Sequence, residues 1–581
     1  MRDASDWTYL GRRYGVAALL AVTFVIFAGA LNYAPLENLD DWAYVTENPN
    51  LGFSAGQLKA LVTEPVLDLY TPLPMLSYLI DYACGGVSPF AYHLQNLLWH
   101  LCAVWLAWLL LRELGLRRES ALLAALIFAV HPQRVESVVW ISERKDVMCT
   151  VFMLLSLILH LQARRRGARL SLASGAAMVL ALLCKPIAVA IPGILFLLEI
   201  RRLRRFDWKA ALRSVILPCV LAVLYLIAST ALLGRVSRQA AEGGGVDLLL
   251  VGRNILAYFV KTFVPWGVVP IHPDFVASDL AVMAVFLGLA LAGTAVALGR
   301  KYRRDLVDFD ILPLLGAGFL PLLPVLGFVP FSNADFADRY SYLPSVFFLA
   351  ALFFCFDRFR LGRFRWYRPA VLIAAGLLAV HTLSILPTWR DDRAMLERCC
   401  SVPGPNFRAA VAWAGRLLEE EHPEAAAEVL RTAGKESRRA QVLLNREAMK
   451  QYAAFLDAVA RFQAGDPQAE AALRSVAETA DRALLRQLYY RSGIMLWTAL
   501  AQCQLAGGRA AEAAASFREL AADYENDRFL PHFYRGVAAM LERDPKTAQT
   551  EFAEALVARP DDQQTILNYQ AAAERVAAAG K

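Results

Sequence analysis

The chain has 581 residues, of which 57% are hydrophobic and 19% are charged, and its formal net charge at pH 7 is +7. A composition this apolar excludes a wholly soluble protein, and the length leaves room for more than one domain. Long apolar runs continue to about Pro387, after which Ala, Glu, Arg and Gln predominate. We therefore expect a polytopic membrane domain over residues 1–390 and a polar helical domain over residues 391–581.

The first domain contains repeated apolar runs of the kind that form membrane helices. The first run follows Arg12 and Arg13 and has no clear cleavage site leading into a soluble domain, so we expect a retained helix and not a cleaved signal peptide. The predicted spans are residues 14–33, 90–111, 119–131, 146–163, 169–184, 186–200, 210–233, 279–299, 311–328, 342–357 and 368–387. These eleven spans predict an all-α fold.

Arginine-rich segments between these spans bear on topology and on partners. They lie at residues 112–118, 164–169, 201–205, 300–304 and 358–368. Basic clusters also occur in nucleic-acid-binding proteins, but short basic loops between apolar runs are typical of the cytoplasmic side of a membrane. A cytoplasmic N-terminus places all five segments on that side and the C-terminal domain on the other. We therefore expect an integral, multi-pass protein of a bacterial inner membrane with a periplasmic C-terminal domain and no nucleic-acid partner.

Four external loops follow from this topology, at residues 34–89, 132–145, 234–278 and 329–341. The first contains two adjacent carboxylates, Asp40 and Asp41, followed by Trp42. Such a pair either caps a helix or solvates a loop, or it belongs to a functional site. The pair alone does not decide between these readings, but the other loops carry cationic side chains that would meet it at the same membrane face.

The polar domain shows a pattern of paired helices. Phe517 and Phe552 each follow a turn that contains Gly or Pro, and they are 35 residues apart, close to the 34-residue tetratricopeptide period. The pattern predicts a tetratricopeptide-like array of helical hairpins. Such arrays bind peptide or protein segments on a concave face. The alternative is that the array packs only on the membrane domain or on itself.

Several ordered motifs resemble one known family. They are Asn38-Leu39-Asp40-Asp41 with Asn48-Pro49, Tyr70-Thr71-Pro72-Leu73, Phe90-Ala91-Tyr92-His93-Leu94-Gln95-Asn96-Leu97-Leu98-Trp99-His100, and His131-Pro132-Gln133-Arg134-Val135-Glu136-Ser137-Val138-Val139-Trp140 followed by Arg144-Lys145-Asp146. Together with the terminal repeats they are similar to the transmembrane-and-tetratricopeptide-repeat protein O-mannosyltransferases and their bacterial homologues. The Gln133-Arg134 pair departs from the family pattern, which has a small or His-containing pair before the glutamate.

The resemblance implies a GT-C glycosyltransferase, an inverting enzyme that moves a sugar from a polyprenyl-phosphate donor to a protein hydroxyl outside the cytoplasm. It also implies that the essential carboxylate lies at Asp40-Asp41, and we favour Asp40 slightly as the general base. One alternative is the same chemistry on a glycolipid or a cell-envelope polymer. Another is a non-catalytic scaffold whose repeats recruit a partner. A transporter fits less well, because the charges gather on one face and not through the spans.

Sugar transfer to a hydroxyl needs a general base and a stabilised leaving phosphate, so cationic donors are expected at the external interface. The candidate substrate-binding residues are His93, His131, Arg134, Glu136, Arg144, Lys145, Lys185 and Arg339. Lys185 lies between two apolar spans, where an unpaired ammonium is costly, although it could also snorkel from a helix end. Glu136 could instead pair with Arg134 or Arg144 and only hold its loop.

Other features narrow the ligands that we expect. Arg339 could bind the phosphate or form a structural ion pair with Asp335 or Asp338. No Gly-rich phosphate loop or dinucleotide motif occurs in a meaningful context, which favours a lipid-linked donor over a nucleotide sugar. No cofactor is expected, since the carboxylates could hold a metal but the mechanism needs none. The expected partners are the polyprenyl-phosphate-linked sugar, a protein acceptor held by the repeats, and membrane lipids.

Overall fold

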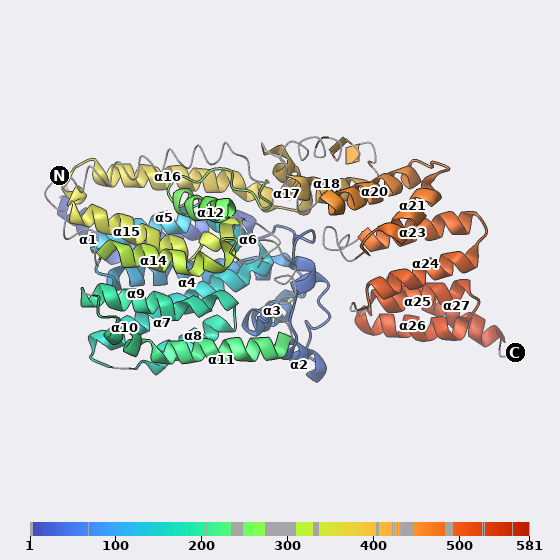
Figure 1. The fold of residues 1–581 in the computed structure, drawn as a ribbon, viewed down its shortest axis with the longest axis horizontal. Coiled ribbons are helices and arrows are strands. Elements are labelled where there is room, and N and C mark those ends of the chain that lie inside the picture. Colours follow the sequence, from blue (N-terminus) through green and yellow to red (C-terminus); the bar gives the residue numbers. More distant parts are fainter. Residues whose placement is uncertain are drawn as a thin grey trace. The chain divides into compact units, whose positions relative to one another are not determined.

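The computed structural model is mainly helical (Figure 1). It describes residues 4–67, 69–168, 170–204, 206–233, 248–273, 310–328, 336–402, 406–420, 446–482, 492–525, 529–560 and 562–579, with a few isolated positions in 421–432 and at 527. Within these residues there is no β-strand, and one isolated bridge joins Val66 and Leu69. The prediction of an all-α fold is therefore confirmed for the described part of the chain.

Two compact units divide the described residues, the first ending at Met395 and the second beginning at Leu396. The helices up to this point are α1 (Ala4–Phe27), α2 (Ala55–Thr63), α3 (Pro72–Gly85), α4 (Pro89–Glu113), α5 (Arg118–Val130), α6 (Arg134–Val139), α7 (Arg144–Arg165), α8 (Leu172–Leu182), α9 (Ile191–Leu203), α10 (Trp208–Ser214), α11 (Ile216–Leu233), α12 (Leu248–Lys261), α14 (Leu312–Phe319), α15 (Pro344–Arg358), α16 (Tyr367–Ile385) and α17 (Asp392–Ser401). Short helical turns connect several of them, including η2 (Trp42–Thr46), η3 (Ile141–Glu143), η4 (Pro186–Ala190), η7 (Leu320–Val325) and η8 (Asp338–Ser341).

Three helices in the described residues are long and apolar enough to cross a membrane. They run over Pro89–Glu113, Ile141–Arg165 and Tyr367–Trp389. α10 and α11 would together form a fourth span, but a bend of 60° separates them. The last of the three presents an apolar face outward, with Ile373, Leu377 and Val380 each more than 60% exposed, as expected for a surface that contacts lipid. The chain is therefore an integral membrane protein.

The prediction of eleven spans is met only in part by the described helices. α5, α8 and α15 have 13, 11 and 15 residues, and at about 1.5 Å per residue they are shorter than the roughly 30 Å hydrocarbon core. The predicted span 311–328 divides into α14 and η7, which contains Pro321 and Pro324, because proline lacks the N–H that an α-helix needs. Residues 279–299 and the basic segment 300–304 lie outside the described residues.

The segment 132–145, predicted as an external loop, is helical and buried within the first unit. It forms α6, η3 and the first turn of α7, and every residue from His131 to Thr150 is buried. α6 packs against α4, α5 and α7. The external placement of the segment stays a prediction, whereas its packing could not be predicted because a run of polar residues does not show which groups their side chains contact.

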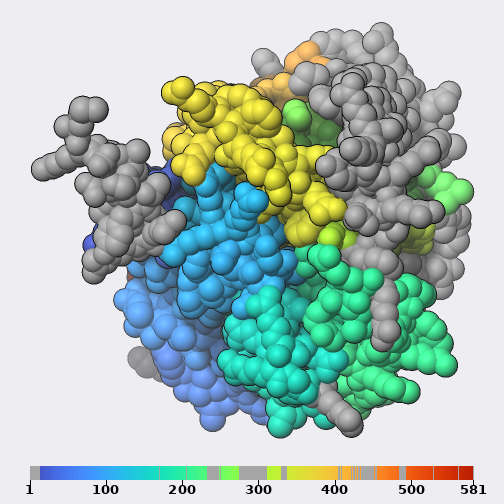
Figure 2. Space-filling model, turned by 90° about the vertical axis from the view of Figure 1, so that its left-hand side faces the viewer, coloured from blue at the N-terminus to red at the C-terminus, as the bar shows by residue number. Residues whose placement is uncertain are grey.

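α7 is the central helix of the first unit, and it packs against α4, α8 and α9. Figure 2 looks onto the end of the unit at which residues near 120 (blue) and residues near 360 (yellow) lie side by side. There Ser120 Oγ donates a hydrogen bond of 2.6 Å to Asp357 Oδ1. The candidate site lies at the other end of α7, around Glu143 and Lys145.

The second unit is a succession of helices, each packed on its neighbours in the chain. After α17 they are α18 (Phe407–Glu419), α20 (Arg446–Gln463), α21 (Ala469–Thr479), α23 (Ser492–Ala506), α24 (Ala510–Asp523), α25 (Leu530–Leu541), α26 (Pro545–Ala558) and α27 (Gln563–Ala579). Phe517 stacks on Tyr534 with 8° between the rings, and Phe552 is fully buried against Phe533. The two phenylalanines thus belong to the core, whereas the tetratricopeptide assignment itself stays a prediction.

Candidate active site

The Asp40-Asp41 pair divides into one buried and one partly exposed carboxylate. Asp41 is 1% exposed, and it accepts hydrogen bonds from the backbone N–H groups of Leu36 (2.8 Å) and Ser142 (2.9 Å). Burial raises the pKa of Asp41 to about 6, although the two N–H groups oppose that rise. The side chain of Asp40 is 39% exposed and lies 3.7 Å from the ammonium of Lys145. Asp41 therefore holds the first loop against η3, and Asp40 is the carboxylate that a ligand can reach.

Glu143 is the centre of the charged cluster. Its carboxylate is buried and lies 3.2 Å from Lys145 Nζ, 3.2 Å from Lys185 Nζ and 3.4 Å from Arg339 Nε. Lys145 lies over the Tyr44 ring, 4.6 Å from its centroid, and makes no aligned hydrogen bond. Three cationic side chains distant in the sequence thus meet at one carboxylate, beside Asp40.

Lys185 is a paired cation and not a snorkelling one. Its ammonium donates to Asp146 Oδ1 over 2.5 Å and to Glu143 Oε2 over 3.2 Å. Asp146 also shares a side-chain hydrogen bond with Glu143. Lys185, Asp146 and Glu143 thus form one buried group in which each side chain pairs with the other two.

Arg339 joins this cluster to α6. It donates from Nη1 to Glu136 Oε1 over 2.5 Å and from its backbone N–H to Glu136 Oε2 over 2.9 Å. Burial raises the pKa of Glu136 to about 7, an effect that the guanidinium of Arg339 partly offsets. Glu136 thus pairs with Arg339, not with the nearby arginines proposed from the sequence. Of the two structural partners considered for Arg339, Asp335 lies outside the described residues, and Asp338 pairs with other groups.

A small pocket opens next to this cluster. Asp146, Arg339 and Tyr340 are among its polar lining residues. The remaining lining residues are Cys149, Thr150, Met153, Ile187, Tyr342, Leu343 and Pro344. The pocket thus places charged groups beside apolar ones.

Arg144 lies apart from this cluster, although it neighbours Lys145 in the chain. Its guanidinium is fully buried among α3 and α4. The partners are Asp81 Oδ2 (2.5 Å), Asn96 Oδ1 (2.6 Å), the Tyr92 carbonyl (2.8 Å), Ser77 Oγ (3.1 Å) and Gln95 Oε1. Arg144 thus holds the first loop to α7, with its donors directed at α3 and α4.

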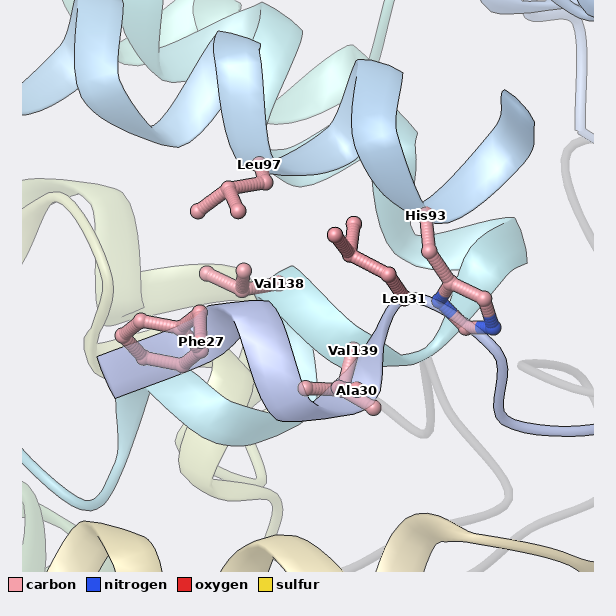
Figure 3. A pocket seen from close by; sticks show the side chains of 7 residues that line it. All are labelled: Phe27, Ala30, Leu31, His93, Leu97, Val138 and Val139. Atoms are coloured by element: carbon pink, nitrogen blue, oxygen red, sulfur yellow. The ribbon is translucent and has the colours of Figure 1, made fainter. Parts of the chain in front are cut away.

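His93, His131 and Arg134 are also outside the Glu143 cluster. His93 lies 3.1 Å from the Tyr33 carbonyl and lines a second, apolar pocket of about 180 Å³ between α1, α4 and α6 (Figure 3). Nδ1 of His131 accepts from the backbone N–H of Gln133. Arg134 donates to Ser341 Oγ over 2.7 Å and lies over the Tyr342 ring. These three residues shape the walls around the cluster.

Sequence reasoning missed two acidic members of the cluster, Glu143 and Asp146, and the buried Asp338. Four consecutive charged residues, 143–146, at the start of an apolar span were the available signal, because such a run is costly unless paired. Among the described residues, no group of three or more His, Cys, Asp or Glu side chains has an arrangement that could hold a metal ion.

Comparisons with known proteins agree with the motifs. Residues 71–232 match the family described as dolichyl-phosphate-mannose-protein mannosyltransferase. Protein O-mannosyl-transferase TMTC4 of Homo sapiens is 26% identical over 410 residues, which cover 57% of this chain and 53% of that protein. Protein O-mannosyl-transferase Tmtc3 of Drosophila melanogaster is 26% identical over 445 residues, covering 61% and 46%. Tmtc1 of the same species is 32% identical over 187 residues, covering 30% and 21%.

Among solved structures, the crystal structure of ArnT from Cupriavidus metallidurans bound to undecaprenyl phosphate matches with a TM-score of 0.38 and 15% identity, over 90% of this chain and 81% of that one. The chain spans about half or less of the length of the curated relatives above. The sequence matches confirm the resemblance that the motifs indicated. The chain is related to the transmembrane-and-tetratricopeptide-repeat protein O-mannosyltransferases.

Proposed function

We propose that this chain is an inverting GT-C glycosyltransferase that moves a sugar, mannose by analogy with its relatives, from a polyprenyl-phosphate donor to a protein hydroxyl. The observation that carries the proposal is one continuous cluster. It begins at the partly exposed Asp40, passes through Lys145, Glu143 and Lys185, and ends at Arg339 on the edge of the mostly apolar pocket. The site thus contains both a candidate base, Asp40, and cations beside the pocket that could bind a phosphate.

Asp40 is assigned as the general base. The acceptor hydroxyl oxygen attacks C1 of the sugar from the face opposite the phosphate, and its proton passes to the Asp40 carboxylate. The bond between C1 and the phosphate oxygen breaks, and its electron pair leaves with the phosphate. The sugar configuration inverts because the new bond forms opposite the old one. Asp41 fixes the loop that carries Asp40 through its two backbone N–H partners.

Arg339 and Lys185 are assigned to the phosphate. The phosphodiester of the donor carries one negative charge and the released monoester carries more, so cations at the pocket edge stabilise the developing charge. Lys145 lies between the base and this edge. The mostly apolar walls of the pocket accommodate the first isoprene units of the carrier. Glu136 holds Arg339, while His93, His131, Arg134 and Arg144 support the surrounding helices and do not contact the substrate.

The acceptor and the cellular placement rest on the relatives and on the composition. The names of the relatives indicate a protein acceptor, and we propose that the helical unit after Leu396 presents it. The basic segments favour a cytoplasmic N-terminus, which puts the site and the C-terminal unit on the periplasmic side. The alternative acceptor, a glycolipid or cell-envelope polymer, uses the same cluster and is decided by the experiment below.

The proposal is tested by mass spectrometry of envelope proteins and glycolipids from a strain that lacks this chain. We expect hexose-modified peptides to disappear and to return with the unaltered chain, but not with the Asp40→Asn variant. Asp41→Asn should return them in proportion to the amount of folded protein. Full glycosylation with both variants would refute the enzyme assignment. Loss confined to glycolipids would show that the acceptor is a lipid.

A further inference from the structure

A seam of three side-chain contacts joins α6 to η8. Gln133 Nε2 donates to Asp338 Oδ1 over 2.8 Å, and Arg134 Nη2 donates to Ser341 Oγ over 2.7 Å. The Glu136–Arg339 pair forms the third contact. Each contact joins η8 to a residue of α6 or to Gln133, the N-cap of α6, and the two segments are about 200 residues apart in the chain. The Gln133-Arg134 pair, which departs from the family pattern, therefore has a partner for each member.

Asp338 anchors η8 to two further segments. Its carboxylate is fully buried and lies 2.9 Å from Lys261 Nζ, at the end of α12, and 2.9 Å from His272 Nε2. Ser341 Oγ donates back to the Asp338 carbonyl over 2.7 Å, which closes the turn. Three segments of the chain thus converge on the residue that directly precedes Arg339.

Arg339 needs such support because its own turn cannot supply it. η8 has four residues, and a 3-10 turn of that length has few backbone hydrogen bonds to hold its orientation. Arginine also has a long flexible side chain, and immobilising it opposes phosphate binding unless the backbone is already in place. A fixed η8 therefore lowers the entropy that is lost when Arg339 engages an anion.

We infer that Asp338 and Gln133 are positioning residues that hold Arg339 in the geometry required to bind the phosphate of the donor. This inference rests on the proposed function, since it takes Arg339 as the phosphate ligand. Neither residue lines the pocket. Asp338 acts on Arg339 through the backbone of η8, and Gln133 acts on it through its hydrogen bond to Asp338.

The competing explanation is that Asp338 is only a buried ion pair that stabilises the fold. Glu199 provides a matched control, because it is an equally buried carboxylate with two cationic neighbours. Arg164 and Arg202 lie 3.2 and 2.8 Å from it, and His160 Nε2 lies 3.6 Å from it, at the opposite end of α7. A role in stability alone predicts the same result for Asp338→Asn and Glu199→Gln.

The experiment measures binding of undecaprenyl phosphate to the purified full-length chain in detergent by isothermal titration calorimetry, together with donor KM, kcat and Tm. Asp338→Asn and Gln133→Met are compared with Glu199→Gln and with Arg339→Gln. We expect Asp338→Asn and Gln133→Met to weaken binding and raise donor KM by about tenfold, the order of one charge-assisted hydrogen bond, with kcat little changed. Glu199→Gln should lower Tm and leave the dissociation constant unchanged.

Each outcome decides a separate point. Weaker binding in Arg339→Gln but not in Asp338→Asn or Gln133→Met overturns the positioning role and leaves the proposed function intact. Equal weakening in Glu199→Gln also overturns it, because the effect would then follow from stability. No binding by the unaltered protein overturns the proposed function, and the inference with it. Should Asp338→Asn fail to fold, Gln133→Met decides, since it removes one neutral donor and leaves the Lys261 and His272 contacts in place.

Discussion

The two ends of α7 both contain buried charges, and they use them differently. At the end near Arg164, one carboxylate, Glu199, accepts hydrogen bonds from Arg164 (3.2 Å) and Arg202 (2.8 and 2.9 Å). At the end near Lys145, several carboxylates share the cations, and Lys145 makes no aligned hydrogen bond. A pocket opens beside the second cluster.

The difference that we use is the sharing of partners. Buried atoms without a hydrogen bond occur at both ends, at His160 Nε2 and at Lys145 Nζ. Of the two clusters, however, only the one at Glu143 has a carboxylate shared by two lysines and an arginine with a pocket beside it. The arginines around Glu199 hold α7 to α9. The cations around Glu143 share their carboxylates, and we propose that an incoming anion takes the place of one of these carboxylates. The predictions below test this contrast.

The largest effect is expected at Asp40. Replacing it with Asn removes the base and should lower the transfer rate by about 10³-fold, the usual contribution of general-base catalysis. Tm should change little, because the side chain is 39% exposed and its ion pair with Lys145 is long, at 3.7 Å. Transfer assays on purified protein with a polyprenyl-phosphate sugar, alongside thermal unfolding, check both parts. An unchanged rate would remove Asp40 from the mechanism.

The next effect is expected at Lys185. Lys185→Met removes the partner of Asp146 and one cation of the phosphate edge. Donor KM should rise by about 10- to 100-fold, as expected for losing a charge-assisted hydrogen bond to a phosphate. Lys185→Arg should recover part of the affinity, because the charge is kept and the geometry is changed. Steady-state kinetics at varied donor concentration distinguish this outcome from a general loss of active protein, which would lower kcat alone.

A smaller, pH-dependent effect is expected at Glu136. Its pKa is raised from an ordinary value near 4.5 to about 7, so the carboxyl is mainly neutral below pH 7 and ionised above it. Arg339 faces it as a cation, while Asp338 and Glu143 face it as anions. The ionised form competes with the donor phosphate for Arg339, and donor affinity should therefore fall several-fold between pH 6 and pH 8. Glu136→Gln should flatten this dependence, and an identical slope in the variant would contradict the assignment.

The smallest effect on activity is expected at the structural end of α7. Glu199→Gln leaves Arg164 and Arg202 without their counter-ion and should lower the free energy of unfolding by about 2 kcal/mol. The transfer rate per folded molecule should be unchanged, because the site is at the other end of the helix. Tm and active-site titration on the same sample measure the two quantities. A loss of transfer in the folded fraction would mean that the two ends of α7 are coupled.

Much of this arrangement was accessible from the sequence, and part of it was not. The spans that became α4, α7 and α16 were visible because their apolar runs are long and have no proline in their interior. The structure brings Asp40, Lys145, Lys185, Glu136 and Arg339 together, all of which the motifs and their chemistry had singled out. The pairing of Glu136 with Arg339 was inaccessible, since 203 residues separate them.

The directions of adjacent side chains were a second feature that could not be predicted from the sequence. Arg144 and Lys145 are consecutive in the first turn of α7, where successive side chains point about 100° apart around the helix axis. Arg144 therefore turns to Asp81 and Asn96 in one cluster, and Lys145 turns to Glu143 and Asp40 in another. A linear motif cannot separate these directions without the neighbouring helices, so both residues had been expected to bind substrate.

The ion pairs that Lys145, Lys185 and Arg339 make in the structure affect the affinity of the site for phosphate ligands. Lys145, Lys185 and Arg339 each have a carboxylate within 3.7 Å already, so inorganic phosphate or a soluble sugar nucleotide gains little by displacing one. A carrier with a hydrocarbon tail adds the burial of its isoprene units in the pocket, at roughly 25 cal/mol per Å² of apolar surface. Under the proposed function, the cost of displacing a carboxylate is the same for every phosphate ligand, so selectivity for a membrane-bound donor over the soluble anions comes from the hydrocarbon chain.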